Sequence, residues 1–242
     1  MCTVSFIYKG NDEFVLTSNR DESPIRETKE PAIYNIADSK LIFPKDIVGG
    51  GTWIGISDKK RVVCLLNGGF EKHVRLPKYR HSRGVVVKDF LTAVHIEEEV
   101  ANYNLALIEP FTVVIVDWTY GLQLFELVWD GTQKHFQKLP LTIPHIWSSS
   151  TLYTEKMKQL RLDWFAEFQQ KENLKASTLL NFHKTAGVGD SNVDVIMDRG
   201  VVKTISITQI EKHTDIISMK YQDFAKNTES TISFNTIEAL HE

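Results

Sequence analysis

The chain has 242 residues, of which 42% are hydrophobic and 24% are charged, a composition typical of a globular protein that can bury its own core. Its formal net charge of −3 argues against a nucleic-acid-binding protein, which would need a clustered basic surface. The N-terminal residues lack the regions of a secretory signal, and no window approaches the ~18 consecutive apolar residues that span a bilayer. Two cysteines distant in sequence do not make a disulfide framework. We therefore expect a cytoplasmic protein.

The first predicted elements form a hairpin. Residues 3–8 are rich in β-branched and aromatic side chains, a Gly-Asn-Asp turn follows at residues 10–12, and residues 14–18 form the returning strand. The polar segment after this hairpin, with Pro24 and Pro31, predicts no clear element.

The remaining elements alternate in blocks. Further strands are expected at residues 52–57, 61–67, 111–118, 122–129, 145–150, 201–210, 216–221 and 231–234. Helices are expected at residues 85–93, 154–170 and 174–183, with a short one beginning at Glu97. This order differs from strict βαβα alternation and fits two antiparallel sheets with helices packed outside them. We therefore predict the α+β class, as a four-layer αββα sandwich forming a single domain over residues 1–242.

Cys2 is a candidate nucleophile because of its position in the chain. Its small side chain would let a methionine aminopeptidase remove Met1 and expose the cysteine. The free α-amine, with a pKa of roughly 7.7–8.0, can then take the thiol proton near neutral pH. A thiol of pKa about 8.5 needs only modest activation. However, a cysteine at the start of a strand is more often simply a small buried hydrophobe, so position alone leaves both interpretations open.

A charged motif, Asn19-Arg20-Asp21-Glu22, follows the second strand of the predicted hairpin. Antiparallel pairing would bring it close to Cys2. Asp21 could then hold the α-ammonium group, while Arg20 could pair with a neighbouring carboxylate or with a substrate. The alternative is a charged turn that closes the hairpin.

Two further segments have competing interpretations. Asn67 precedes Gly68 and Gly69, and its amide together with nearby backbone N–H groups could stabilise an oxyanion, although an ordinary turn explains the pattern equally. The densest basic segment, residues 72–83, is interpreted as a solvated loop. The eight histidines show no metal-ligand spacing, so we predict no metal site and no cofactor.

Several of these features together resemble the family named for its Asn-Arg-Asp-Glu motif, also called the transport-and-Golgi-organisation family. The resemblance covers roughly residues 1–90 and adds a late stretch, residues 203–210. Its matching segments are Met1-Cys2, Asn19 to Glu22, Gly50 to Gly55, Asn67 and Ser82-Arg83-Gly84.

The N-terminal pattern also resembles the choloylglycine hydrolase and penicillin V acylase group, N-terminal-nucleophile hydrolases that cleave non-peptide C–N amide bonds. That resemblance implies that Cys2 is the nucleophile, that Asp21 holds its amine and that Asn67 contacts the oxyanion or substrate. Asn19, Arg20 and Arg83 are our candidates for substrate binding. The chain differs from the group at position 18, where Ser18 replaces an arginine, and it lacks a clear second oxyanion asparagine.

Two functional hypotheses follow. The first is a cysteine amidohydrolase that acts through a thioester acyl-enzyme. The second is a non-catalytic binding or trafficking protein for an acyl or other hydrophobic small ligand on the same scaffold, which the missing oxyanion donor favours. Both predict a small molecule as the partner, and the oligomeric state is not indicated by the sequence.

Overall fold

The computed structural model describes residues 3–235, which divide into two compact units. The first unit contains residues 3–26 and 141–235, and the second contains residues 27–140. The first unit is thus assembled from two segments that are distant in sequence. The single domain expected over residues 1–242 stays a prediction.

The first unit is built on a six-stranded antiparallel sheet with the order β10-β1-β2-β11-β12-β13. Its strands are β1 (Thr3–Gly10), β2 (Glu13–Glu22), β10 (His145–Ser148), β11 (Lys203–His213), β12 (Ile216–Asp223) and β13 (Thr228–Asn235). The predicted turn joins β1 and β2, with φ angles of 51° at Asn11 and 60° at Asp12. Such left-handed residues suit a tight hairpin because their twist matches that of the strands.

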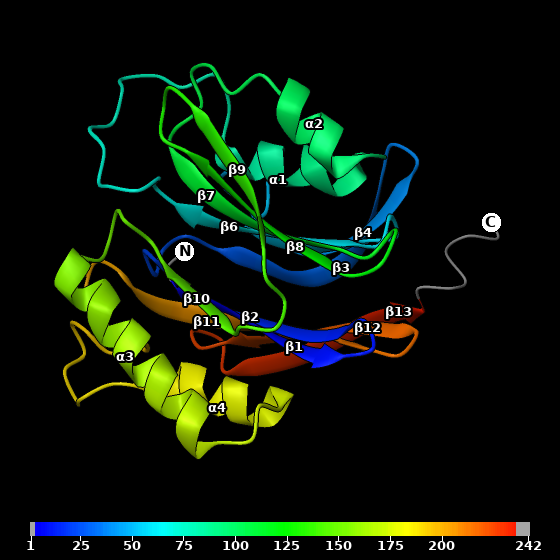
Figure 1. Cartoon of the computed structure of the whole chain (residues 1–242). Helices are drawn as coiled ribbons and strands as arrows, with labels where there is room; N and C mark the ends of the chain where they lie inside the picture. Colours follow the sequence, from blue (N-terminus) through cyan, green and yellow to red (C-terminus); the bar gives the residue numbers. More distant parts are fainter. Residues whose placement is uncertain (1–2, 236–242) are drawn as a thin grey trace. The chain divides into compact units, whose positions relative to one another are not determined.

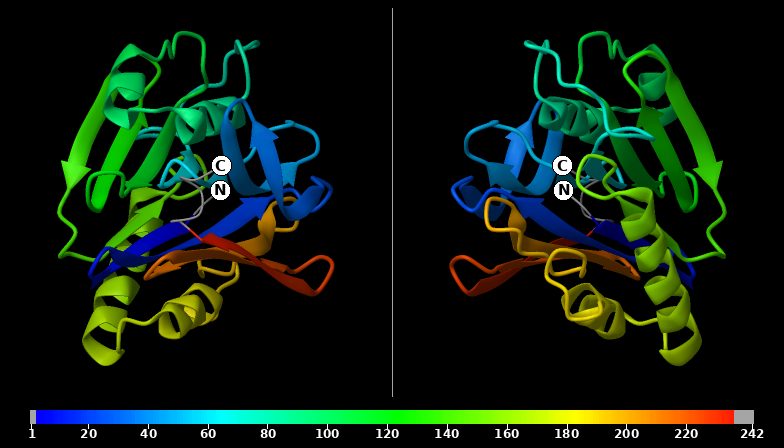
Figure 2. Two further views of the ribbon diagram at one scale, coloured as in Figure 1. Left: turned by 90° about the vertical axis from the view of Figure 1, so that its right-hand side faces the viewer. Right: turned by 90° about the vertical axis from the view of Figure 1, so that its left-hand side faces the viewer.

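Two helices, α3 (Glu155–Lys171) and α4 (Ala176–Thr185), cover one face of this sheet (Figures 1 and 2). Three phenylalanines from these helices, Phe165, Phe168 and Phe182, pack with ring centroids 5.2–5.8 Å apart. Ile7 and Val15 join them from β1 and β2. Burial of each such side chain stabilises the fold by about 1.5–3 kcal/mol. Alternate residues of β1 and β2 therefore face the helices.

The second unit is a seven-stranded antiparallel sheet in which strands follow one another in chain order, from β3 to β9. Its elements are β3 (Thr28–Ile36), β4 (Ser39–Asp46), β5 (Ile54–Ser57), β6 (Arg61–Asn67), α1 (Arg83–Thr92), α2 (Ile96–Asn102), β7 (Phe111–Asp117), β8 (Gln123–Trp129) and β9 (Lys134–Leu139). The core of this unit lies between α1, α2 and the sheet, where Phe90 and Val86 meet Leu65 and Val113.

A buried arginine holds the end of α1 against the sheet. Arg61 donates from Nε to Oδ2 of Asp117 at 2.8 Å and from Nη1 to the carbonyls of Phe90 and Ala93, at 2.9 and 2.7 Å. Burial lowers the pKa of Arg61, and the charge of Asp117 works against this shift. The guanidinium group therefore satisfies two carbonyls at the helix end, which helices otherwise leave unpaired.

Three strands were missed in the sequence: β3, β4 and β9. Pro31 lies in β3 where the register with β4 shifts between Lys29 and Ala32. Because β3 is an edge strand, a residue without a backbone N–H is tolerated there. β9 is the opposite edge and alternates between exposed and half-buried residues without an apolar stripe. Edge position thus weakened the hydrophobic signal of β3 and β9. The interior strand β4 differs, because its apolar run, residues 41–43, is short and is followed by Pro44.

Candidate functional site

The charged motif lies inside a strand rather than in a turn. Residues 19–22 form the end of β2, between β1 and β11, with Thr3 opposite Asn19 and Thr204 opposite Asp21. The charged-turn interpretation is therefore wrong. The predicted nearness of the motif to the chain start agrees with the register of Thr3, while Cys2 itself lies outside the described residues.

Asn19 is fully buried and ties β2 to α4. Its Nδ2 donates to the carbonyls of His183 and Val195 at 3.1 and 3.0 Å, and its Oδ1 lies 2.6 Å from Nδ1 of His183. An amide oxygen only accepts, so Nδ1 of His183 carries a hydrogen, and Nε2 accepts from the Ser5 hydroxyl at 2.7 Å. Burial lowers the pKa of His183 to about 3. Asn19 is therefore engaged in a structural network, and its proposed role in substrate binding stays a prediction.

Asp21 is buried, and both of its oxygens are held by hydroxyl groups. Tyr153 donates to Oδ2 at 2.5 Å and Thr204 donates to Oδ1 at 2.5 Å. Two fixed donors leave the carboxylate one orientation. Such orientation is what a charge-holding group in an active site requires.

Tyr153 is positioned in turn by two arginines. The guanidinium carbon of Arg161 lies 3.7 Å from the centroid of the Tyr153 ring, and that of Arg199 lies 5.4 Å from it. Cations over an aromatic face are attracted by its quadrupole. Arg161 also donates to the carbonyl of Asp194 at 3.0 Å, and Arg199 donates to that of Leu152 at 2.9 Å. This chain of contacts, absent from the sequence-based candidates, fixes the donor to Asp21.

Strand alternation directs Arg20 to the face of β2 opposite to Asn19 and Asp21. Arg20 is 2% exposed, and Ser206 is its partner in the register of β11. The substrate-binding role proposed for Arg20 stays a prediction.

In the second unit, the structure brings Asn67 and Arg83 to the same backbone segment. Asn67 is the last residue of β6 and pairs with Phe111 of β7. The next residue, Gly68, donates its N–H to the carbonyl of Pro110 at 3.0 Å, and Nη1 of Arg83 donates to that carbonyl at 3.1 Å. The oxyanion role of Asn67 and the substrate-binding role of Arg83 stay predictions.

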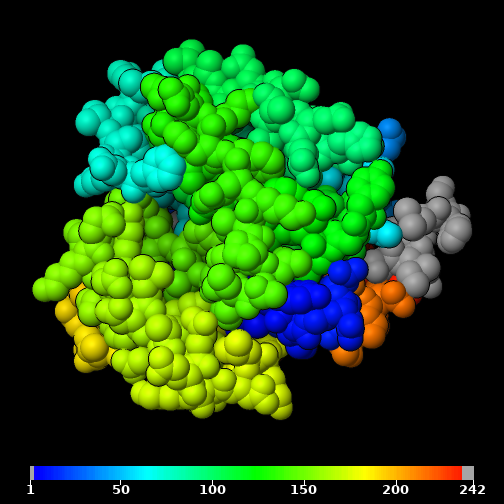
Figure 3. All heavy atoms as spheres, in the orientation of Figure 1, coloured from blue at the N-terminus to red at the C-terminus, as the bar shows by residue number. Residues whose placement is uncertain are grey.

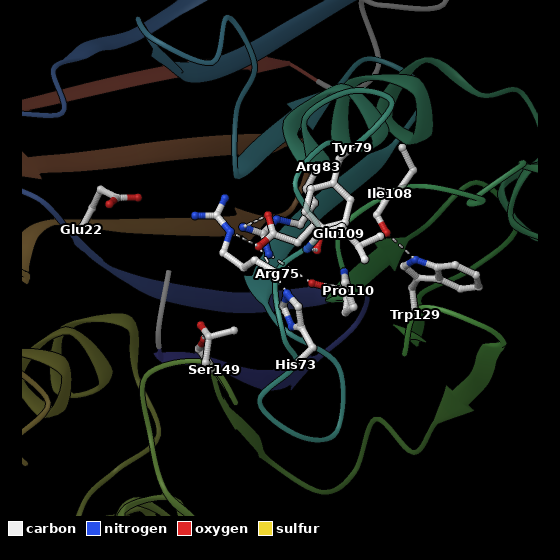
Figure 4. Close-up of polar contacts among 12 residues, drawn as sticks. Glu22, His73, Arg75, Tyr79, Arg83, Ile108, Glu109, Pro110, Trp129 and Ser149 are labelled. Carbon is white, nitrogen blue, oxygen red and sulfur yellow. Dashed lines mark hydrogen bonds and ion pairs between the residues drawn. The ribbon is translucent and has the colours of Figure 1, made fainter.

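Glu109 gathers three basic side chains around this segment. Its carboxylate is 3.1 Å from Nη2 of Arg83, 3.0 Å from Nε of Arg75 and 3.3 Å from Nε2 of His73. Figure 4 shows the three side chains converging on Glu109 beside Pro110. The sequence indicated the basic segment 72–83, but nothing in it pointed to Glu109, which lies 26 residues after Arg83.

The glycines of the second unit explain two other matching segments. A Cβ atom built on Gly84 would lie 2.9 Å from the carbonyl oxygen of Thr52, and one built on Gly51 would lie 2.8 Å from the carbonyl carbon of Gly84. Backbones this close admit only glycine. These residues of the Gly50–Gly55 and Ser82–Gly84 segments therefore pack the start of α1 on the chain before β5.

Among residues 3–235, no group of three or more histidine, cysteine or acidic side chains is arranged to hold a metal ion. Cys64 is buried in β6. None of the helices in this range is both long and apolar enough to cross a membrane.

Comparison with solved structures defines the class of fold. The chain is similar over 98% of its length to a single-residue variant of conjugated bile acid hydrolase from Clostridium perfringens, at 11% identity, with a TM-score of 0.55 and 93% of that chain covered. It is also similar over 98% of its length to penicillin V acylase from Agrobacterium tumefaciens, at 12% identity, with a TM-score of 0.59 and 87% of that chain covered.

A third similar structure is the Caenorhabditis elegans ortholog of N-acylethanolamine-hydrolyzing acid amidase, at 11% identity, with a TM-score of 0.60 over 86% of this chain and 92% of that one. These likenesses confirm the predicted α+β fold class, with two antiparallel sheets and helices as in these three hydrolases.

Residues 1–236 match the family Transport and Golgi organisation 2, and the chain therefore belongs to this family. The resemblance inferred from the sequence motifs is thus confirmed. The chain is 31% identical over 122 residues to Transport and Golgi organization protein 2 of Drosophila melanogaster. That match spans 46% of this chain and 42% of the Drosophila protein.

Proposed function

We propose that the protein is a cysteine amidohydrolase that cleaves a non-peptide C–N amide bond through a thioester acyl-enzyme. The observation that carries the proposal is the fixed carboxylate of Asp21. It lies at the end of β2 that pairs with the start of β1, with both oxygens held by hydroxyl donors. Two of the similar structures are named for hydrolysis of conjugated bile acids and of N-acylethanolamines, which is consistent with amide chemistry on this scaffold.

In the proposed reaction, the α-amine of Cys2 takes the thiol proton, and sulfur attacks the amide carbonyl carbon. Asp21 holds the resulting ammonium group, while the amide of Asn67 donates to the oxyanion. The C–N bond then breaks, and the proton passes from the α-ammonium to the departing amine. Water then adds to the thioester carbonyl as its proton passes to the α-amine. The C–S bond breaks, the carboxylic acid leaves, and the α-ammonium returns its proton to sulfur to restore the thiol.

The experiment uses the full chain and its two cysteines. Intact mass measured before and after iodoacetamide treatment near neutral pH should give loss of Met1 and rapid modification at one site. A screen of N-acyl amides should then give turnover that Cys2→Ala abolishes. Cys64→Ala is the matched control because Cys64 is buried in β6. Turnover that survives Cys2→Ala, or a retained Met1 with an inert Cys2, would refute the proposal.

The second candidate is a ligand-binding protein without turnover. It is favoured by a cavity of about 460 Å³ in the first unit, in the range of small-molecule sites. Met197, Ile205 and Phe224 give it apolar walls, and Lys203 lies at its lining beside Thr204. This candidate predicts saturable binding of a fluorescent fatty acid, weakened by Ile205→Glu. Absence of saturable binding would exclude the cavity as an acyl site.

A further inference from the structure

The segment between β6 and α1 concentrates positive charge on a protein whose net charge is −3. Residues 70–83 contain five lysine and arginine side chains and one glutamate. Figure 3 shows this segment, coloured cyan, on the surface of the second unit. From the sequence we interpreted its residues 72–83 as a solvated loop. Its irregular backbone agrees with a loop, but the positions of its side chains add a second property.

That property is a basic cluster, made of His73, Arg75 and Arg83 around Glu109. One carboxylate faces two guanidinium groups and an imidazole, so the cluster carries a net charge of +1 with His73 neutral. Glu109 is 12% exposed, whereas the side chain of Arg75 is 76% exposed. The positive charge in excess is therefore presented to solvent by Arg75.

Arg75 has hydrogen-bonding capacity to spare. Its Nε bonds to Glu109 at 3.0 Å, and among residues 3–235 its remaining N–H groups make no other hydrogen bond or ion pair. A guanidinium group has five N–H donors in a planar fork that matches carboxylate and phosphate oxygens. Because Glu109 already restrains the guanidinium group, Arg75 loses less conformational entropy on binding an anion than an unrestrained arginine would.

The cluster has a rigid support. Nε1 of Trp129 donates to the carbonyl of Ile108 at 2.9 Å, and Gly68 and Arg83 donate to that of Pro110. The segment from Ile108 to Pro110 is therefore held on both sides of Glu109 (Figure 4). It also connects the cluster to the backbone next to Asn67, the proposed oxyanion residue.

We propose that Arg75 and this basic cluster recognise an anionic group, a carboxylate or a phosphate, on the small molecule that the protein takes. The inference rests on the proposed function in placing that molecule beside Asn67, and it adds a chemical requirement on the substrate. Arg75 determines specificity here and takes no part in bond cleavage.

The test measures binding separately from turnover. Calorimetry on full-length Cys2→Ala compares three probes that share a dodecanoyl group: N-dodecanoylglycine, N-dodecanoyl-O-phosphoethanolamine and neutral N-dodecanoylethanolamine. At least one anionic probe should bind about tenfold more tightly than the neutral one, and the better of the two identifies the anion. This preference should shrink as salt screens the exposed guanidinium group.

Variants assign the effect to Arg75. In the same background, Arg75→Gln should weaken binding of the preferred anionic probe about tenfold and leave the neutral probe unchanged. Arg75→Lys should recover part of the preference, because it keeps the charge without the planar fork. Lys59→Gln, which removes one charge at the opposite end of β6, is the control and should change nothing.

Equal binding of all three probes would overturn the inference, as would an Arg75→Gln variant that weakens them equally. The proposed hydrolysis is tested separately, by incubating the wild-type protein with the same compounds. Anion-selective binding without hydrolysis would support the cluster and count against the amidohydrolase. Hydrolysis of every probe without an Arg75-dependent preference would support the amidohydrolase and count against the cluster.

Discussion

The hydroxyl of Tyr153 donates a 2.5 Å hydrogen bond to Oδ2 of Asp21, a residue 132 positions earlier in the chain. Asp21 is the penultimate residue of β2, while Tyr153 precedes α3, so the bond joins the two sequence segments of the first unit. The aromatic ring of Tyr153 in turn lies beneath the guanidinium group of Arg161. The candidate charge-holding residue is thus oriented by groups from the far part of the chain.

Tyr153→Phe should destabilise the protein by about 1–3 kcal/mol, because a buried carboxylate oxygen loses its hydroxyl donor. Urea unfolding measures the change. Tyr120→Phe is the control, since Tyr120 is 81% exposed, and should stay within about 0.5 kcal/mol of wild type. If Cys2 acts as proposed, Tyr153→Phe should also shift the pH profile of its alkylation. Equal effects of the two substitutions on stability would contradict the structural role of the bond.

His183 should make the protein sensitive to acid. Its pKa in the folded state is about 3, because burial disfavours the charged ring, against an unperturbed value of 6.5. The unfolded chain therefore binds a proton that the folded chain excludes, so stability is lost as pH falls from about 6.5 toward 3. Between pH 6 and pH 4 this residue should cost about 2 kcal/mol.

Unfolding of wild type and His183→Gln by urea at several pH values measures this contribution. The variant should be less stable at pH 7 and should lose less stability on acidification. His95→Gln, which changes an exposed histidine, should keep the wild-type slope. An unchanged slope in His183→Gln would show that other groups cause the acid sensitivity.

Because Arg61 and Asp117 form a buried ion pair, replacing Arg61 alone should lower the free energy of unfolding more than replacing both residues. Arg61→Met should cost about 3–5 kcal/mol, because Asp117 keeps its charge without its partner. The double variant Arg61→Met with Asp117→Leu should be less destabilised, since no buried charge remains unpaired. Urea unfolding of the two single variants and the double variant measures the coupling. A double variant as unstable as the sum of the single variants would contradict it.

For Gly84→Ala, steric packing and helix propensity predict opposite changes in stability. Alanine is the better helix former by about 1 kcal/mol, so propensity alone predicts stabilisation in α1. The new Cβ would lie 2.9 Å from the backbone oxygen of Thr52, so we expect destabilisation by about 1–3 kcal/mol. Thermal unfolding of both variants measures the change. Ser82→Ala, at a cap position without a side-chain capping bond, is the control and should be nearly neutral. Stabilisation by Gly84→Ala would show that the backbones separate easily.

The helices and most strands could be predicted from the sequence, including the edge strands β10 and β13, whereas β3, β4 and β9 could not. The strand expected at residues 61–67 is observed as β6 (Arg61–Asn67), because it is buried on both faces and its residues are apolar. The helix expected at residues 154–170 is observed at Glu155–Lys171, one residue later at each end. In contrast, β3 and β9 have water on one side and a neighbour on the other, so polar residues and a proline suffice.

For the candidate site, the sequence identified the motif residues but assigned Asn19 and Arg83 without their surroundings. Asn19 proved to hold α4 through His183, and Arg83 proved to hold Glu109. Neither partner lies at a spacing that a helix or strand would bring together. Hydrogen bonds between segments this distant follow from packing, which a local pattern does not encode.

The sequence by itself determined the α+β class, the family and the position of the Asn-Arg-Asp-Glu motif near the chain start. These depend on hydrophobic periodicity and on the order of short motifs, which are properties of neighbouring residues. Only the tertiary structure decided what the motif side chains contact, because Tyr153, Thr204 and His183 come from the second half of the chain. It also decided that Arg75 is exposed while its neighbours around Glu109 are half-buried. The sequence shows how many charges the chain carries, but only the fold determines which of them form ion pairs and which are exposed to solvent.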